Sequence, residues 1–145
     1  MQNAVYELIP RWLKQRQSLL IALYDLCHHR PFFLRLNCQE LQGALQEFSG
    51  QILDYLSLGH FKIYESILDY VGQPLSNVVT QLNGSTHQIL NLNDKYRFKL
   101  NVKQLDKDLG ALTEILAKRF ELEDKLISST LGSTHSRKRG LSWLN

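Results

Sequence analysis

The stretch NVKQLDKDLGALTEILAKRFELEDKLISSTLG, residues 101–132, carries a long and regular apolar stripe. Large apolar side chains recur every three or four residues up to Phe120, and Ile127 follows seven residues later. The stripe consists of Leu105, Leu109, Leu112, Leu116, Phe120 and Ile127. This spacing places them on one face of an α-helix. Asn101 stands just before the stripe and is a residue type that caps helix N-termini. We therefore predict one long helix from Asn101 to near Gly132.

Apolar stripes of the same kind fill most of the remaining chain. They predict helices over 9–29, over about 37–58 and over 61–71. A weaker pattern permits a further helix over 75–97, which the NGST sequence at 83–86 is expected to interrupt or bend. Alternating runs typical of strands are few. The fold class predicted from the sequence is all-α, an up-down helical bundle with four main helices plus short connecting helices.

Two residues set the expected helix boundaries. Pro10 suits the first turn of the first helix, where its missing N–H costs nothing. Gly59 is expected to end or bend the second helix, because glycine costs about 1 kcal/mol in a helix interior. The 145 residues suggest one bundle domain, residues 1–131, followed by a flexible basic C-terminal tail, residues 132–145.

The net charge of +3 comes from the tail. Beyond Leu126 the only charged side chains are Arg137, Lys138 and Arg139, and without them 14 basic and 14 acidic residues remain. A neutral body is a poor candidate for nucleic-acid binding, so no direct DNA binding is expected. No apolar run approaches the roughly 18 residues of a membrane span, and the N-terminus does not read as a secretory signal. The expected location is the cytoplasm, with no membrane partner.

Several polar residues interrupt the apolar stripes. Arg16 falls between Leu13 and Leu20, and Glu123 falls between Phe120 and Ile127. Buried charges must be paired, so Arg16 with Glu123 is one expected pair. His60 with Asp54 or Tyr64 is another. Two interpretations stay open: a satisfied structural polar layer, or a polar cavity that opens at one end of the bundle and binds a partner.

Catalytic and metal-binding interpretations have little support. Asp54, Ser57 and His60 could share one side of a helix, but no nucleophile elbow accompanies them. The paired Glu-x-x-His motifs of a di-iron bundle are missing from the sequence. Its two cysteines, Cys27 and Cys38, cannot make a structural zinc site alone. We expect no enzyme activity, no catalytic residue, no metal and no cofactor.

Three blocks of sequence resemble one protein family. They are RWLKQRQSLLIALYDL at 11–26, LDYLSLGHFKIYESIL at 53–68 and RFELEDKLI at 119–127. Their order and spacing are similar to those of the Rsd/AlgQ family of bacterial anti-sigma factors, also called regulators of sigma D. The second block is the most distinctive. Each block also contains one of the polar interruptions described above.

The resemblance implies a partner and a mechanism. The expected partner is the C-terminal domain of the primary, sigma-70-type sigma factor, which reads the −35 promoter element and docks on core RNA polymerase. Binding there would sequester the housekeeping sigma factor, so that alternative sigma factors of stationary phase compete better for core. The alternative is a signalling adaptor that binds the phosphocarrier HPr or another regulatory protein. A monomer or weak dimer is expected.

The resemblance also implies site residues. It places partner-binding groups near the mouth of the polar cavity and at the head of the first helix: Asp54, Ser57, His60, Tyr64, Arg11 and Trp12. Trp12 fits the hydrophobic core equally well. The polar cavity itself is assigned to Arg16, Arg119, Glu123 and Asp124.

Overall fold

The computed structural model describes residues 2–32, 39–59, 63–71, 75–97 and 101–132. These residues form five α-helices and no strand, so the predicted all-α class is confirmed. The helices are α1 (Gln2–Cys27), α2 (Gln39–Leu58), α3 (Tyr64–Val71), α4 (Ser76–Lys95) and α5 (Val102–Gly132).

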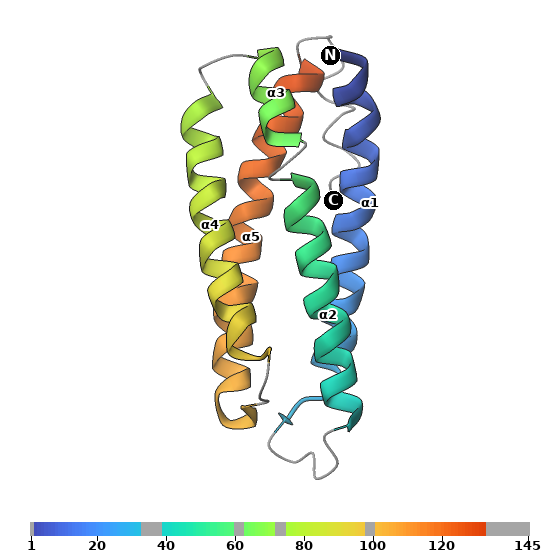
Figure 1. Ribbon diagram of the computed structural model, residues 1–145, viewed down its shortest axis with the longest axis vertical. Helices are drawn as coiled ribbons and strands as arrows, with labels where there is room; N and C mark the ends of the chain where they lie inside the picture. The colour runs from blue at the N-terminus through green and yellow to red at the C-terminus, as the bar shows by residue number, and fades with distance from the viewer. Residues whose placement is uncertain (1, 33–38, 60–62, 72–74, 98–100, 133–145) are drawn as a thin grey trace.

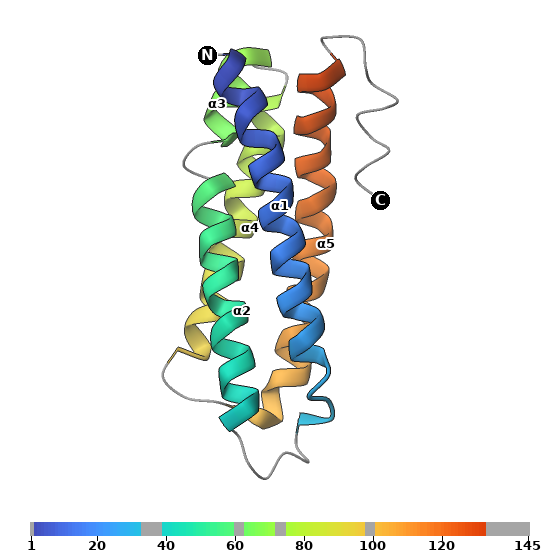
Figure 2. The same cartoon turned by 90° about the vertical axis from the view of Figure 1, so that its right-hand side faces the viewer.

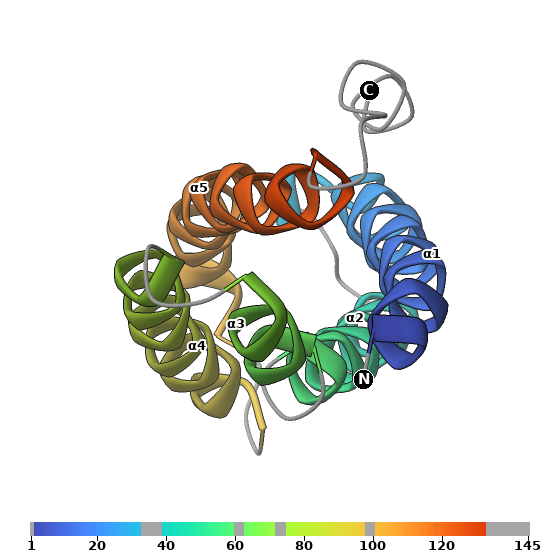
Figure 3. The same ribbon diagram turned by 90° about the horizontal axis from the view of Figure 1, so that it is seen from above.

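The helices run up and down along one axis, as the sequence predicted (Figure 1). α1 packs against α2 and α4 packs against α5, so the bundle consists of two helical hairpins. The short α3 lies beyond the end of α2 and contacts α1, α4 and α5 (Figure 2). Seen along the axis, the long helices surround a common interior, with α3 between α2 and α4 (Figure 3). Side chains from every helix can therefore meet near α3.

Helix α5 is the longest element and forms one wall of the bundle for its full height (Figure 1). Its 31 residues span about 46 Å at 1.5 Å per residue. Asn101 caps it as predicted, because its Oδ1 accepts a hydrogen bond from the backbone N–H of Gln104 at 3.3 Å. The stripe predicted from its sequence is buried at Leu105, Leu109, Leu112 and Leu116. The helix thus supplies both the core and, further along, the polar residues.

Two expectations about helix boundaries and continuity were wrong. Helix α1 begins at Gln2 rather than near residue 9, so Pro10 lies inside the helix and not in its first turn. Packing of Leu8 and Ile9 on the core holds the preceding turn although proline removes one backbone hydrogen bond. Helix α4 is continuous across residues 83–86, so of the interruption or bend that we expected there the interruption does not occur. The side chains of Ser85 and Thr86 explain this, because both hydroxyls bond within the helix to the carbonyl oxygen of Leu82.

Candidate functional site

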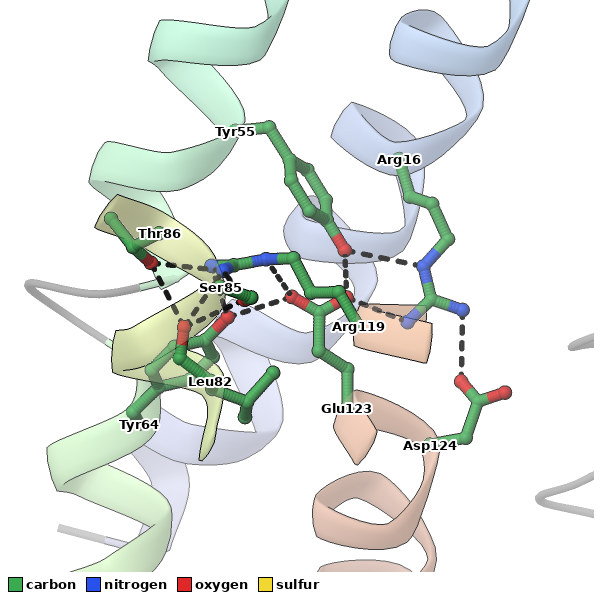
Figure 4. Close-up of polar contacts among 9 residues, drawn as sticks. All are labelled: Arg16, Tyr55, Tyr64, Leu82, Ser85, Thr86, Arg119, Glu123 and Asp124. Carbon is green, nitrogen blue, oxygen red and sulfur yellow. Dashed lines mark hydrogen bonds and ion pairs between the residues drawn. The ribbon is translucent and has the colours of Figure 1, made fainter. Parts of the chain in front are cut away.

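A cluster of polar side chains lies in the interior of the bundle (Figure 4). We call it the polar cluster; its members are Arg16, Tyr55, Tyr64, Ser85, Thr86, Arg119, Glu123 and Asp124. They come from α1, α2, α3, α4 and α5, so each of the five helices contributes at least one side chain. The stripes of the individual helices turn toward a shared interior, which brings their polar interruptions together.

Arg16 joins α1 to α5 through two carboxylates. Its Nη1 donates to Asp124 Oδ1 at 2.8 Å and its Nη2 donates to Glu123 Oε1 at 3.2 Å. The predicted pair of Arg16 with Glu123 is confirmed. The Arg16 side chain is 10% exposed and that of Asp124 is 32% exposed, whereas Glu123 is fully buried. Asp124 is therefore the member through which the polar cluster reaches the surface.

Glu123 is the central acceptor. Tyr55 donates its hydroxyl proton to Glu123 Oε1 in a short hydrogen bond, and Tyr64 donates to Glu123 Oε2 at 2.7 Å. Arg119 Nε donates to the same Oε2 at 3.2 Å, one helical turn away on α5. Together with Arg16, four side chains donate to one buried carboxylate. This satisfies the requirement that a buried charge be both paired and hydrogen-bonded.

Arg119 is fully buried and carries the cluster to α4 and α3. Its Nη1 donates to Ser85 Oγ at 2.6 Å, to Thr86 Oγ1 at 2.9 Å and to the carbonyl oxygen of Leu82 at 3.1 Å. Its Nη2 donates to the Tyr64 hydroxyl at 2.5 Å. Both hydroxyls on α4 also donate to the Leu82 carbonyl, so these residues bond within the helix and to Arg119 instead of breaking α4.

Burial and the neighbouring charges shift the pKa values of three cluster members, Tyr55, Tyr64 and Arg16. Burial raises the pKa of Tyr55 well above its usual value, and the neighbouring Glu123 carboxylate adds to the effect. The same two causes raise the pKa of Tyr64. Burial alone would lower the pKa of Arg16, but its interactions with Tyr55 and Glu123 outweigh this and raise it. The two phenols therefore keep their protons and remain hydrogen-bond donors to Glu123.

The residues expected to bind a partner divide between the surface and the core. Asp54 and Ser57 are exposed on α2, and Arg11 is exposed on α1. Arg11 and Leu58 line the same depression between the two helices, so Arg11 lies near the end of α2 that carries Asp54 and Ser57. His60 lies outside the described residues.

Trp12 and Tyr64 are in the core rather than on this surface. Both are almost completely buried, and their rings meet edge-on with centroids 5.6 Å apart. Trp12 also stacks on Tyr55, with ring centroids 6.3 Å apart. These aromatic rings pack against one another in the core beside the polar cluster. Their side chains position the cluster and do not reach the surface that carries Asp54.

Sequence reasoning missed three members of the polar cluster. Tyr55 was given no role, although it lies within the sequence block at 53–68 that carries the family resemblance. Ser85 and Thr86 were treated as helix interruptions. Their signal was present, since two adjacent hydroxyl residues on an apolar stripe need a buried partner. Identifying Arg119 as that partner required the packing of α4 on α5.

The parts of the chain that the structure describes show neither a metal-binding cluster nor a membrane-spanning helix. Within those ranges no group of three or more histidine, cysteine, aspartate or glutamate side chains could hold a metal ion. None of the helices described here is long and apolar enough to cross a membrane. Chemically, the polar cluster is a charge-balanced set of ion pairs and hydrogen bonds that links the helices.

Known proteins resemble this chain over most of its length. Residues 2–131 match the family described as "Regulator of RNA polymerase sigma(70) subunit, Rsd/AlgQ". The chain is 38% identical over 136 residues to the "Regulator of sigma D" of Shigella boydii serotype 4 (strain Sb227), covering 83% of this chain and 82% of the relative. Identity and coverage are the same for the "Regulator of sigma D" of Escherichia coli (strain K12 / DH10B). The chain belongs to the Rsd/AlgQ family of regulators of the RNA polymerase sigma(70) subunit.

Proposed function

We propose that this protein is an anti-sigma factor that acts in the cytoplasm. In this proposal it binds the C-terminal domain of the primary sigma-70-type sigma factor and sequesters that sigma factor from core RNA polymerase and the promoter. Membership in a family of sigma(70) regulators is the observation that carries the proposal. The action is stoichiometric binding rather than catalysis, with residues 1–131 as the binding domain.

The proposed contact residues are Arg11, Asp54, Ser57 and His60. Asp54 is exposed on α2 and free to meet a partner's cation. A domain that reads a promoter element is basic where it meets DNA phosphates. A carboxylate can pair with an arginine of such a domain through charge-assisted hydrogen bonds. Occupying that arginine would remove it from DNA, which gives the contact a regulatory consequence.

The polar cluster supports this surface from within. Tyr55 follows Asp54 directly, and its hydroxyl is fixed by Glu123 and Arg16. The cluster therefore fixes the orientation of α2 about its own axis. This orientation keeps Asp54 and Ser57 on the outside. In this proposal Tyr64 and Trp12 act through packing, and the surface residues make the contact.

The proposal is tested by calorimetric titration of the full chain with the C-terminal domain of the host's primary sigma factor. We expect saturable one-to-one binding with a dissociation constant of about 1 μM or lower, which corresponds to a binding free energy of about −8 kcal/mol or stronger. Asp54→Asn should raise the constant at least about tenfold, which corresponds to about 1.4 kcal/mol. Asp25→Asn, at an exposed aspartate on α1, is the matched control and should leave it unchanged.

Two outcomes would contradict the assignment. No heat of binding across a range of salt concentrations would remove the sigma factor as partner, and HPr titrated under the same conditions then tests the alternative, a signalling adaptor. Equal binding by Asp54→Asn and wild type would leave the partner in place but move the contact elsewhere. Sedimentation of the free chain tests the expected monomer or weak dimer.

A further inference from the structure

Helix α1 exposes a small apolar patch that the proposed function does not use. In the described ranges four large apolar side chains are exposed, and three of them lie within two turns of α1: Leu20, Ile21 and Tyr24. We call these three residues the α1 patch. Leu20 follows Arg11 by nine residues, which places it about 180° from Arg11 around the helix axis. The patch therefore begins on the opposite side of α1 from the proposed sigma-binding surface.

The α1 patch lies beside the seam between α1 and α5. Leu20 and Tyr24 follow Arg16 at intervals of four residues, so they lie toward its side of the helix. Arg16 points to α5 and pairs there with Asp124 at 2.8 Å. The Tyr24 ring packs edge-on against the His28 ring, with centroids 4.4 Å apart, which restrains the tyrosine before anything binds. A segment that reaches the patch thus meets a partly preorganised surface next to α5.

The size of the α1 patch favours a short tethered segment over a second copy of the chain. Three side chains are far fewer than the roughly 20–30 residues that each partner contributes to a stable interface. A segment of the same chain needs much less area, because a short tether gives it an effective concentration of about millimolar. The occupant that fits the patch is therefore a segment of this chain.

Residues 133–145, which follow α5 and lie outside the described residues, contain such a segment. Their large apolar side chains are gathered beyond residue 140, at Leu141, Trp143 and Leu144. Tryptophan supplies a large apolar area with few rotatable bonds, so it loses little entropy when it is held in place. The internal segments outside the described ranges are links of six residues or fewer between two helices. Residues 141–144 are thus the apolar segment that combines a large aromatic ring with a long tether.

The length of the tether lets this segment reach the α1 patch. α1 and α5 run antiparallel, and the ion pair of Arg16 with Asp124 sets their relative height (Figure 2). Gly132 lies eight residues above Asp124 on α5, and Tyr24 lies eight residues below the level of that ion pair on α1. At 1.5 Å per residue the patch therefore lies about 18–24 Å from Gly132 along the bundle axis. The nine residues from Gly132 to Leu141 span up to about 30 Å, which is enough.

We propose that residues 141–144 dock on the α1 patch of the same chain, with the Trp143 ring against the side chains of Ile21 and Tyr24. Residues 133–140 form the connection and carry the three consecutive cations of the sequence SRKRG. The contact covers the exposed apolar side chains of α1 and gives the basic tail a fixed course beside α5. It does not depend on sigma binding, and neither proposal requires the other.

The test uses nuclear Overhauser contacts in the full chain, labelled with ¹³C and ¹⁵N, at neutral pH. We expect contacts between the indole protons of Trp143 and the methyl protons of Leu20 or Ile21. The backbone amide shifts of residues 141–144 should also differ from those in a synthetic peptide of residues 133–145. Trp143→Phe identifies its indole signals, because the other tryptophan, Trp12, is buried in the core and remains. Shifts like those of the peptide, or Trp143 contacts only with other parts of the protein, would overturn the proposal.

A mixture of labelled and unlabelled chains separates docking within one chain from docking between two copies. Docking within one chain gives contacts that do not change on dilution and that are missing from spectra filtered for contacts between labelled and unlabelled chains. Contacts that appear in the filtered spectra and weaken on dilution would overturn the proposal, because the α1 patch would then be an interface between copies.

A matched pair of variants tests the docking surface. Ile21→Lys places a charge in the α1 patch and leaves the core untouched, because Ile21 is exposed. It should remove the Trp143 contacts and bring the amides of residues 141–144 to their positions in the free peptide. Leu53→Lys is the control, since Leu53 is the fourth exposed large apolar side chain of the described residues and lies on α2. It should preserve the contacts. Loss of the contacts in both variants, or in neither, would count against the α1 patch.

Discussion

Replacing Glu123 by glutamine tests the role of the polar cluster in stability. The substitution keeps the shape of the side chain but removes the charge that four donors share, among them Arg16 and Arg119. One of its two terminal atoms also becomes a donor that faces other donors. Removing one partner of a buried ion pair costs about 3–5 kcal/mol because the other charge is left uncompensated. We expect a loss in this range, a large part of the 5–15 kcal/mol that is typical of whole domains.

The measurement is urea unfolding at pH 7 followed by far-ultraviolet circular dichroism. With a slope of about 1–3 kcal/mol per molar urea, the midpoint should fall by at least about 1 M. Glu121→Gln is the matched control, because Glu121 lies on the same helix and its side chain is 70% exposed. Its ion pair with Lys118 is long, at 3.8 Å, and lies at the surface. That control should change stability by less than about 0.5 kcal/mol. If the two variants unfold alike, the buried carboxylate does not stabilise the bundle as argued.

Two further predictions concern glycine and tyrosine. A Cβ at Gly59 would approach the Tyr64 hydroxyl, held by the polar cluster, to 3.1 Å, so Gly59→Ala should cost about 1–3 kcal/mol. Gly110→Ala meets nothing within 4 Å in the middle of α5 and should stabilise by about 0.5–1 kcal/mol; thermal melts that rank them the other way would refute the close contact. Burial raises the pKa values of Tyr55, Tyr64 and Tyr96 in the folded state, so above about pH 10 the unfolded chain releases these protons before the folded chain does. The contribution of these tyrosines to stability is therefore complete below about pH 10 and declines above it. Phenolate absorbance during alkaline titration should rise in two stages, with the second coinciding with unfolding; a single stage that precedes unfolding would contradict the burial argument.

The sequence was sufficient for the helical class and for the polar residues that interrupt long stripes. Glu123 and Arg16 were identifiable because each breaks an otherwise regular apolar period, and their pairing followed from the need to neutralise buried charge. The cap at Asn101 was equally local. These features depend on neighbours within a turn or two, or on a simple rule about charge.

Features that depend on distant packing could not be predicted. Ser85 and Thr86 resemble a helix interruption until Arg119 is brought against them by the pairing of α4 with α5. Pro10 resembles a helix start until Leu8 and Ile9 pack on the core and hold the preceding turn. Trp12 was compatible with either core or surface, and only its ring contacts with the two tyrosines decide the matter.

The position of Arg119 one turn before Glu123 has a consequence for how α5 aligns with its neighbours. If α5 slid by four residues so that Leu109 replaced Leu105, Leu116 would replace Leu112, and of these buried leucine positions only that of Leu109 would receive a polar residue, Thr113. The ion pairs of the polar cluster, in contrast, would be lost. A slide in one direction would bring the Arg119 cation to the place of the Glu123 carboxylate, facing Arg16, and a slide in the other would bring Ile127 there and leave Arg16 without its acceptor. The leucines thus make α5 adhere to the bundle, and the alternation of charge along one turn selects a single vertical alignment.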